Sequence, residues 1–261
     1  MIVIVAAIKD EVAGFLAKGD YRESARQGAV SHRVSDRWPD VTVTIGGAGR
    51  DRAEAATREA LKRYEPDLVV SAGFAGGVAP GFLVGDIVLC DKVWATEGTQ
   101  DGDESHNPVE GVPERWLHEI SGSQRRGECL SVTELAATSD VKQALGAKFP
   151  VDVVDMESYW VTETAARAGV RSIVIRAVLD PVERSLPGLV TGLLGAGTTA
   201  RWIRGLTYVA TRPWSVPDLL TLARETAVAR GALGRMLETI ASTPWPQTEA
   251  IAAMRSADAG R

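Results

Sequence analysis

Cysteine and histidine are scarce in this sequence, and their scarcity limits the kinds of site that the chain can build. Cys90 and Cys129 are the only two cysteines among the 261 residues, and the three histidines lie far apart. Two thiols do not make a disulfide framework, and no CxxC or Cys/His cluster has the spacing of zinc ligands. We therefore expect two buried thiols in a reducing compartment and no metal site.

An excess of positive charge is also missing. The chain has 29 Lys and Arg against 34 Asp and Glu, a formal net charge of −5, whereas a general nucleic-acid binder normally carries a basic face. The apolar run at residues 2–8 has no basic residue before it, unlike a secretory signal peptide, and it is too short to span a bilayer. We therefore expect a cytoplasmic protein that binds no nucleic acid.

Short apolar runs alternate with helix-compatible stretches along the first two thirds of the chain. The strands are expected at 2–7, 41–45, 67–71, 86–94, 151–154 and 171–179. The helices are expected at 8–18, 51–64, 139–148 and 157–168. Such alternation predicts a three-layer α/β/α sandwich with a mixed, largely parallel central sheet. We expect a core over 1–184, a helical C-terminal extension of the same domain over 185–243, and a frayed tail over 244–261.

A glycine-rich turn, Gly46-Gly47-Ala48-Gly49, separates a predicted strand from a helix. Glycine lets the backbone approach an anion, the helix N-terminus presents free N–H groups, and Arg50 adds a charged fork. A plain strand-to-helix turn explains the same residues equally well. A dinucleotide fingerprint fits poorly, because Arg52 stands where that motif needs a small residue. This misfit disfavours a nicotinamide-dependent oxidoreductase.

A second glycine-rich stretch, 72–77, follows the strand at 67–71 and is predicted to be a turn. Its one aromatic residue is Phe74. A turn of this composition holds a flat ring against the backbone, although a buried phenylalanine beside a tight turn has the same pattern.

Carboxylates stand where predicted strands end, the edge at which parallel α/β sheets bind ligands. Asp155 and Glu157 lie at one such junction, where a solvated helix start is the alternative. Asp180 follows an apolar run, and partial burial there raises a carboxyl pKa, so that the group delivers a proton near neutral pH. An Asp-Pro turn is the alternative. Glu11, in the first turn after the first strand, has the same ambiguity.

These segments together resemble the nucleoside phosphorylase superfamily, and within it the methylthioadenosine and S-adenosylhomocysteine nucleosidases. The resemblance covers about residues 1–182 and is most specific at 66–89 and 155–157. A closer resemblance is to the hopanoid-associated members, described as removing adenine from adenosylhopane. They share Asp-Met-Glu-Ser, here 155–158, and Asp-Pro-x-x-Arg-x-Leu-Pro, here 180–187. The resemblance implies a cofactor-free enzyme that cleaves the N-glycosidic bond of a purine nucleoside and forms at least a homodimer.

The resemblance also implies two catalytic groups. Asp180 matches the acid that protonates N7 of the leaving purine. Glu11 matches the residue that positions or deprotonates the attacking water in hydrolytic members. The chemistry suits these residue types, because both groups act on charge that develops in the transition state.

Substrate-binding residues follow from the same resemblance. Glu157 matches the carboxylate that accepts hydrogen bonds from the ribose hydroxyls, and Met156 is implied to pack on the sugar. Gly73 and Phe74 are implied to line the pocket, and Leu135 and Ala136 to belong to a backbone segment that flanks the base.

Two departures from the nucleosidase pattern make the base pocket more apolar. Leu179 stands where the nucleosidases usually have serine before the acid, and Phe74 replaces a small or hydroxylated residue. A substrate other than methylthioadenosine is therefore expected. Hydrolysis and phosphorolysis both stay open, because Glu11 favours water while Arg50 leaves room for inorganic phosphate as a co-substrate.

The C-terminal extension is apolar, and its basic residues are all arginine. One interpretation is a helical lid or a dimer surface. The other is that Trp202, Trp214 and the arginines contact an anionic membrane and give access to a lipid-linked nucleoside. The non-enzyme alternative for the whole chain is an inactive nucleoside-binding module, which would be expected to have lost Asp180 or Glu11.

Overall fold

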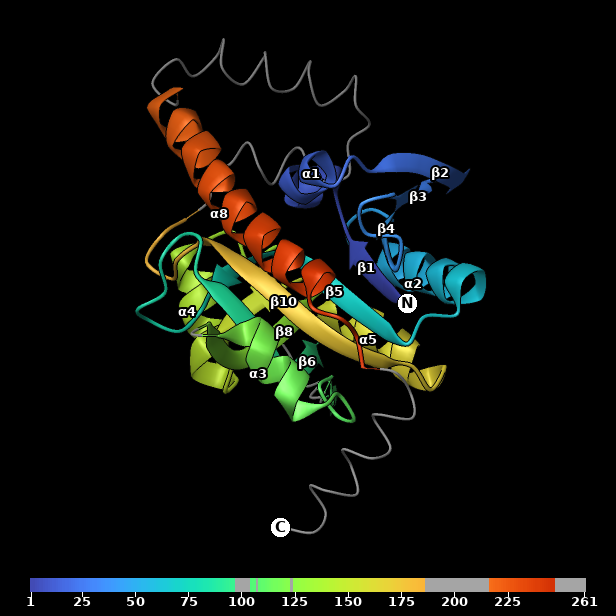
Figure 1. Ribbon diagram of the computed structural model, residues 1–261. Coiled ribbons are helices and arrows are strands. Elements are labelled where there is room, and N and C mark those ends of the chain that lie inside the picture. The colour runs from blue at the N-terminus through green and yellow to red at the C-terminus, as the bar shows by residue number, and fades with distance from the viewer. Residues whose placement is uncertain (97–103, 107, 123, 186–215, 247–261) are drawn as a thin grey trace.

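The computed structural model describes residues 1–96, 104–106, 108–122, 124–185 and 216–246, which form a mixed ten-stranded sheet covered by helices (Figure 1). Many strands are buried along their whole length, as in β1 (Ile2–Ala6) and β4 (Val41–Ile45). Continuous apolar runs of this kind are typical of strands covered on both faces. The predicted α/β class is confirmed.

Four strands extend the sheet as an open wing from one edge of β5 (Leu68–Gly77). In order outward from β5 they are β1, β4, β3 (Val30–Val34) and β2 (Arg22–Gln27). β1 is parallel to both β5 and β4, whereas β3 and β2 turn back as an antiparallel hairpin.

Five strands close on themselves, and we call them the ring. After β5 they are β10 (Arg171–Asp180), β6 (Ile87–Thr96), β8 (Arg125–Val132) and β9 (Val153–Asp155). β9 pairs with β5 again and closes the circle, while β7 (Glu104–His106) adds to β6. The expectation of an open sandwich sheet is therefore wrong for this half. The physical reason is that β5 continues far beyond the end of β1 and offers β9 a free edge.

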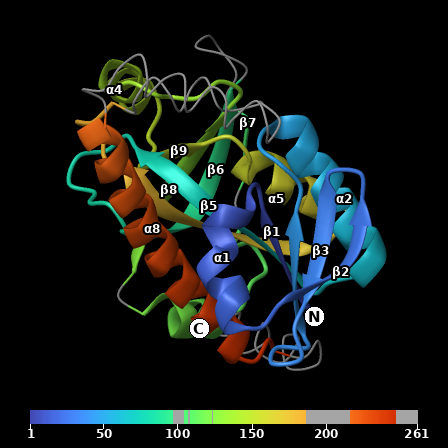
Figure 2. The ribbon, with the colours of Figure 1, turned by 90° about the horizontal axis from the view of Figure 1, so that it is seen from above.

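Helices cover both faces of the sheet (Figures 1 and 2). α2 (Arg50–Tyr64) and α5 (Ser158–Arg167) bury apolar residues in one core cluster. On the other face, a second cluster takes in side chains of α1 (Lys9–Lys18), α3 (Glu114–Ser121) and α8 (Val216–Ser242). α4 (Ser139–Lys148) contributes to a smaller third cluster beside β8 and β9.

The described part of the C-terminal extension belongs to the core. In α8, Leu233, Leu237 and Ile240 are fully buried against the sheet and α1, and Glu238 pairs with Lys18 at 2.7 Å. In the described residues, this helix of the predicted C-terminal extension packs as part of the same domain, because its apolar stripe completes one face of the sheet.

The remaining C-terminal predictions lie outside the described residues. Trp202 and Trp214 fall within 186–215, and most of the predicted tail falls within 247–261. Membrane contact thus stays a prediction. Among the helices that the structure describes, none has the length and hydropathy needed to cross a bilayer.

Candidate active site

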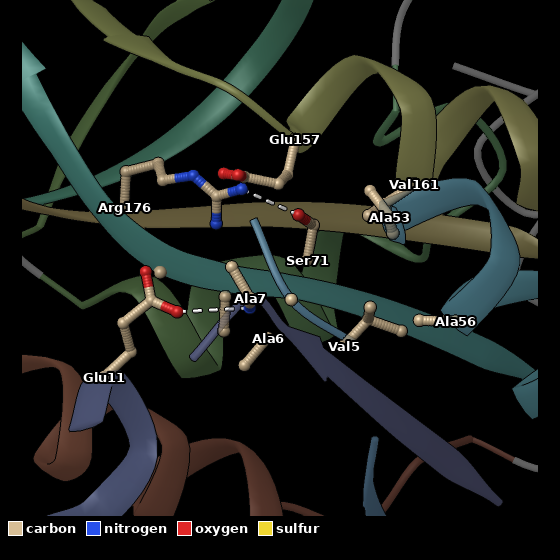
Figure 3. Close-up of a pocket in the computed structure, with 13 residues that line it drawn as sticks. Val5, Ala6, Ala7, Glu11, Ala53, Ala56, Ser71, Glu157, Val161 and Arg176 are labelled. Atoms are coloured by element: carbon tan, nitrogen blue, oxygen red, sulfur yellow. Dashed lines mark hydrogen bonds between the residues drawn. The ribbon is translucent and has the colours of Figure 1, made fainter. Parts of the chain in front are cut away.

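The sheet splits where β1 and β9 share one edge of β5. β1 pairs with residues 68–71 of that strand and β9 with residues 76–77, while β10 runs along the opposite edge. Residues 72–75 therefore face a gap between the wing and the ring. A cavity lies at this gap, and its polar lining is Glu11, Ser71, Glu157 and Arg176 (Figure 3).

Glu11 is fixed at the gap by three backbone N–H groups. Its Oε2 accepts hydrogen bonds from Ala7 at 3.1 Å and Ile8 at 2.9 Å, which caps the start of α1. Its Oε1 reaches across to β5 and accepts the N–H of Phe74 at 3.0 Å. The side chain is 6% exposed, and burial raises its pKa, although the backbone hydrogen bonds and Arg176 act in the opposite direction. A buried carboxylate of this kind is a candidate base.

Gly73 makes this contact possible. A Cβ atom at this position would lie 2.7 Å from Oε1 of Glu11. The glycine-rich stretch is therefore a continuation of β5 and not the turn that its composition predicts. A glycine inside a strand commonly marks such a close approach.

Glu157 faces the same cavity from the ring. It stands at the start of α5, and its Oε1 accepts the N–H of Gly49 at 2.8 Å. Gly49 has φ +94°, a conformation that favours glycine, and it caps α2. Burial, together with the neighbouring Asp155 and Glu11, raises the pKa of Glu157 to about 8. The first glycine turn does present an N–H group toward the site, but this N–H group donates to a carboxyl group of the protein itself.

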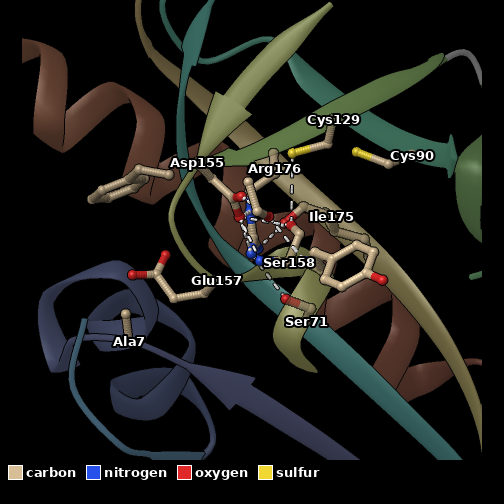
Figure 4. Close-up of polar contacts among 12 residues, drawn as sticks. Ala7, Ser71, Cys90, Cys129, Asp155, Glu157, Ser158, Ile175 and Arg176 are labelled. Atoms are coloured by element: carbon tan, nitrogen blue, oxygen red, sulfur yellow. Dashed lines mark hydrogen bonds and ion pairs between the residues drawn. The ribbon is translucent and has the colours of Figure 1, made fainter. Parts of the chain in front are cut away.

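A buried ion pair lies behind the cavity (Figure 4). Nε and Nη2 of Arg176 lie 2.7 and 2.6 Å from Oδ2 of Asp155, and Nη2 also donates to Ser71 at 2.9 Å. Ser131 and Ser158 donate to Asp155 as well, both at 2.6 Å. Burial would raise the pKa of Asp155, but Arg176 and the hydroxyls outweigh it and lower the pKa.

The sequence pattern did not predict Arg176 to be a site residue, and it placed Asp155 at a strand-to-helix junction without a role. The signal was a charged residue inside an otherwise apolar strand, since Arg176 is 2% exposed in the middle of β10. Buried charges need partners, so such a residue predicts a polar site nearby.

Asp180 occupies the last position of β10 and is 5% exposed. Nζ of Lys142, a fully buried residue of α4, lies 2.7 Å from its Oδ2. Burial raises the pKa of Asp180 to about 6, although Lys142 and Arg184 act to lower it. Lys142 is a further residue that the sequence pattern did not reveal.

Asp180 stands at some distance from the cavity, along the same strand pair. β10 pairs with β5 so that Arg176 lies opposite Gly73 and Asp180 opposite Gly76. Three strand residues correspond to about 10 Å. Asp180 therefore lies about 10 Å farther along the strand pair than the residues that face the gap.

The other predicted site residues fall into two groups. Met156, Phe74 and Leu135 are partly buried and Ala136 is buried, with the last two in the loop between β8 and α4. Arg50, in contrast, lies outside the cavity. Its side chain is 42% exposed, pairs with Glu54 at 3.2 Å and lies 4.2 Å from the ring centre of Trp160.

Comparison with known proteins gives consistent matches. A family model described as "Phosphorylase superfamily" matches residues 1–191. Futalosine hydrolase from Streptomyces coelicolor is 34% identical over 197 residues, which are 68% of this chain and 81% of that protein. A 5'-methylthioadenosine/S-adenosylhomocysteine nucleosidase from Shewanella baltica is 27% identical over 203 residues, 71% of this chain and 86% of that protein.

Solved structures show the same fold. The 5'-methylthioadenosine/S-adenosylhomocysteine nucleosidase from Neisseria meningitidis, in complex with methylthio-immucillin-A, matches with a TM-score of 0.63 and 18% identity. The match covers 92% of this chain and 98% of that one. Similarity at this level of identity concerns the fold.

Proposed function

This chain belongs to the phosphorylase superfamily, and we propose that it hydrolyses the N-glycosidic bond of a purine nucleoside at the gap between β1 and β9. That it is an enzyme cleaving N-glycosidic bonds follows from its relatives. One observation carries the proposal of hydrolysis. The Glu11 carboxylate is aimed at the cavity by three backbone N–H groups, beside Glu157 and Arg176.

The spacing of the carboxyl groups orients the substrate. We place the ribose between Glu11 and Glu157, where Glu157 accepts hydrogen bonds from its hydroxyls, and the base toward Asp180. The separation of about 10 Å along β5 suits a purine nucleoside lying lengthwise. Leu135 and Ala136 then flank the base, because their loop leads into α4, the helix that contacts Asp180.

The proton and electron transfers balance for hydrolysis. As the bond between ribose and base breaks, its electron pair goes to the base, and protonated Asp180 gives its proton to N7. The sugar becomes oxocarbenium-like, and the carboxylate of Glu11 and the carboxyl oxygens of Glu157 stabilise that positive charge. Water adds its oxygen to the sugar carbon and loses a proton to Glu11. Proton exchange with solvent then returns Asp180 to its protonated form and Glu11 to its carboxylate form.

Two contacts favour water over phosphate as the nucleophile. The N–H of Gly49, at the helix start where a phosphate would bind, already donates to Glu157. Arg50 lies outside the cavity and pairs with Glu54. The Glu11 carboxylate at the gap also repels an anion.

For the substrate we propose an adenosyl lipid of the adenosylhopane type. The support is the pattern at 180–187 and the apolar character of Phe74 and Leu179, which both pack against the larger core cluster. The names of the relatives supply two competing substrates, futalosine and methylthioadenosine.

Release of free base tests the proposed function. The protein would be incubated with adenosine, inosine, methylthioadenosine, futalosine and an adenosyl-lipid analogue, each with and without phosphate, and the base measured by chromatography. We expect release without phosphate, fastest from the lipid analogue, and its loss in Asp180→Asn. A requirement for phosphate would identify a phosphorylase. Tight binding with no release from any of the compounds would identify an inactive binding module.

Gly73→Ala is expected to reduce activity through Glu11. The new methyl group would meet Oε1 of Glu11 at 2.7 Å and push the carboxylate away. A displacement of this size is expected to lower kcat/KM by about a hundredfold. Gly77→Ala is the matched control on the same strand, because its methyl group would meet nothing closer than 3.5 Å. Equal activity of the two variants would contradict the placement of Glu11.

A further inference from the structure

Lys142 is the one fully buried lysine among the described residues, and its ammonium group contacts the predicted acid. We propose that Lys142 is the positioning residue of Asp180: it binds Oδ2 and so leaves Oδ1 to face the base of the substrate. This inference rests on the proposed function. It concerns a residue that acts through Asp180 and does not itself touch the substrate.

The ammonium group of Lys142 is held by three acceptors around the end of β10. Nζ donates to Oδ2 of Asp180 at 2.7 Å, to the carbonyl of Pro181 at 2.6 Å and to the carbonyl of Asp180 at 3.3 Å. Three acceptors are the full hydrogen-bonding capacity of a lysine. Because two of them are backbone atoms, the lysine fixes the Asp180 carboxyl relative to the main chain.

The start of α4 is itself joined to the segment after β10. Oγ of Ser139 donates to the carbonyl of Val182 at 2.8 Å, and the N–H of Ser139 donates to Oγ of Ser185 at 3.0 Å. The helix that carries Lys142 is therefore docked on the strand end that carries Asp180. This docking removes much of the freedom of a long side chain in advance.

Lys142 occupies one oxygen of the acid. Within the described part of the chain, Oδ1 of Asp180 has no hydrogen-bond partner, and a Cβ added at Gly76 would lie 3.5 Å from it. Glycine at this position keeps β5 from covering Oδ1. Leu179 offers no hydroxyl to hold the acid, and Lys142 supplies that hold from another helix.

An ammonium group also stabilises the anion that Asp180 becomes after it gives up its proton. The charged groups around Asp180 are Lys142 on α4 and Arg184 in the following segment, with Glu225 of α8 paired to Arg184. β5 and β9 contribute Gly76 and Val154, which do not titrate. Burial raises the pKa of Asp180, and Lys142 opposes this effect at short range. Loss of Lys142 would therefore raise the pKa of Asp180.

The pH dependence of base release separates this role from simple packing. Asp180 acts as an acid only when protonated, so kcat/KM falls as the pH rises through the pKa of Asp180 in the free enzyme. In Lys142→Met we expect this alkaline limb to move up by about one unit or more, and kcat to fall about tenfold. Lys142→Arg keeps the charge, and its alkaline limb should stay in place. Lys148→Met, at the exposed end of the same helix, is the control.

The outcomes are distinct. An alkaline limb that does not move in Lys142→Met, with wild-type base release intact, would overturn the role of Lys142 and leave the proposed function standing. A wild-type protein that releases no base would overturn the proposed function itself. If Lys142→Met does not fold, Lys142→Gln removes the charge but keeps a donor, and the same upward shift is expected.

Discussion

Replacing Glu11 with glutamine is expected to lower kcat by about a thousandfold, within the usual range for loss of a general base. The carboxylate accepts three backbone N–H groups, which an amide cannot do with both of its atoms. If the amide oxygen keeps the hydrogen bonds of Ala7 and Ile8, the amide nitrogen points at the N–H of Phe74. Glu11→Gln thus removes the base and also loosens the contact between α1 and β5.

Single-turnover release of base from the best substrate of the panel would measure this effect. Binding of that substrate, followed by equilibrium titration, should change far less than kcat, because the proposed ribose contacts of Glu157 remain. Asp10→Asn is the matched control, since it is the same acid-to-amide change at the neighbouring position, where the side chain is 49% exposed. A Glu11→Gln variant with wild-type kcat would show that Glu11 only caps α1.

Arg176→Met is expected to have the largest effect on stability, about 3 to 5 kcal/mol. The change leaves Asp155 buried without its counter-charge and removes a donor from Ser71. For a chain of this size such a loss lowers the melting temperature by on the order of 10 °C. The pair lies behind the cavity, so activity is expected to fall as well.

Thermal unfolding would measure the loss, and a second variant would assign its cause. The double variant Arg176→Met with Asp155→Asn also removes the unpaired charge of Asp155, so part of the stability should return. Arg22→Met, which breaks the exposed pair with Asp36, is the control and should not change the melting temperature measurably. An unchanged melting temperature in Arg176→Met would contradict the buried pair.

The sequence predicted the helices and strands that are specified by the pattern of their own residues. The strand at 41–45 and the helix at 139–148 have the predicted bounds, because each is a clear apolar or helical run. The hairpin β2–β3 was missed, since β2 reads Arg-Glu-Ser-Ala-Arg-Gln and is largely exposed. The glycines of β5 were taken for a turn because their partner, Glu11, is 63 residues distant from Phe74 in the sequence. The local pattern of apolar and polar residues in a strand does not predict a contact with a residue so far away in the sequence.

In the candidate site, too, features that depend on local sequence were predicted, whereas contacts between distant residues were not. Glu11, Glu157 and Asp180 stand at or just after the ends of strands, so their positions made them candidates and the family resemblance supplied their roles. Lys142 and Asp180 are 38 residues apart, and Arg176 and Asp155 are 21 apart. Their pairing depends on which strands become neighbours, and in particular on the closing of the ring, which the open-sheet expectation did not contain.

Because the sheet splits along β5, the complete site forms only when the wing and the ring are both folded. Glu11 reaches the cavity from the wing, whereas Glu157 and Arg176 reach it from the ring, and β5 is the strand common to both. A molecule in which either half has opened keeps at most part of the site. Such a molecule would be silent in an assay, so specific activity would count only the molecules in which both halves are folded at once.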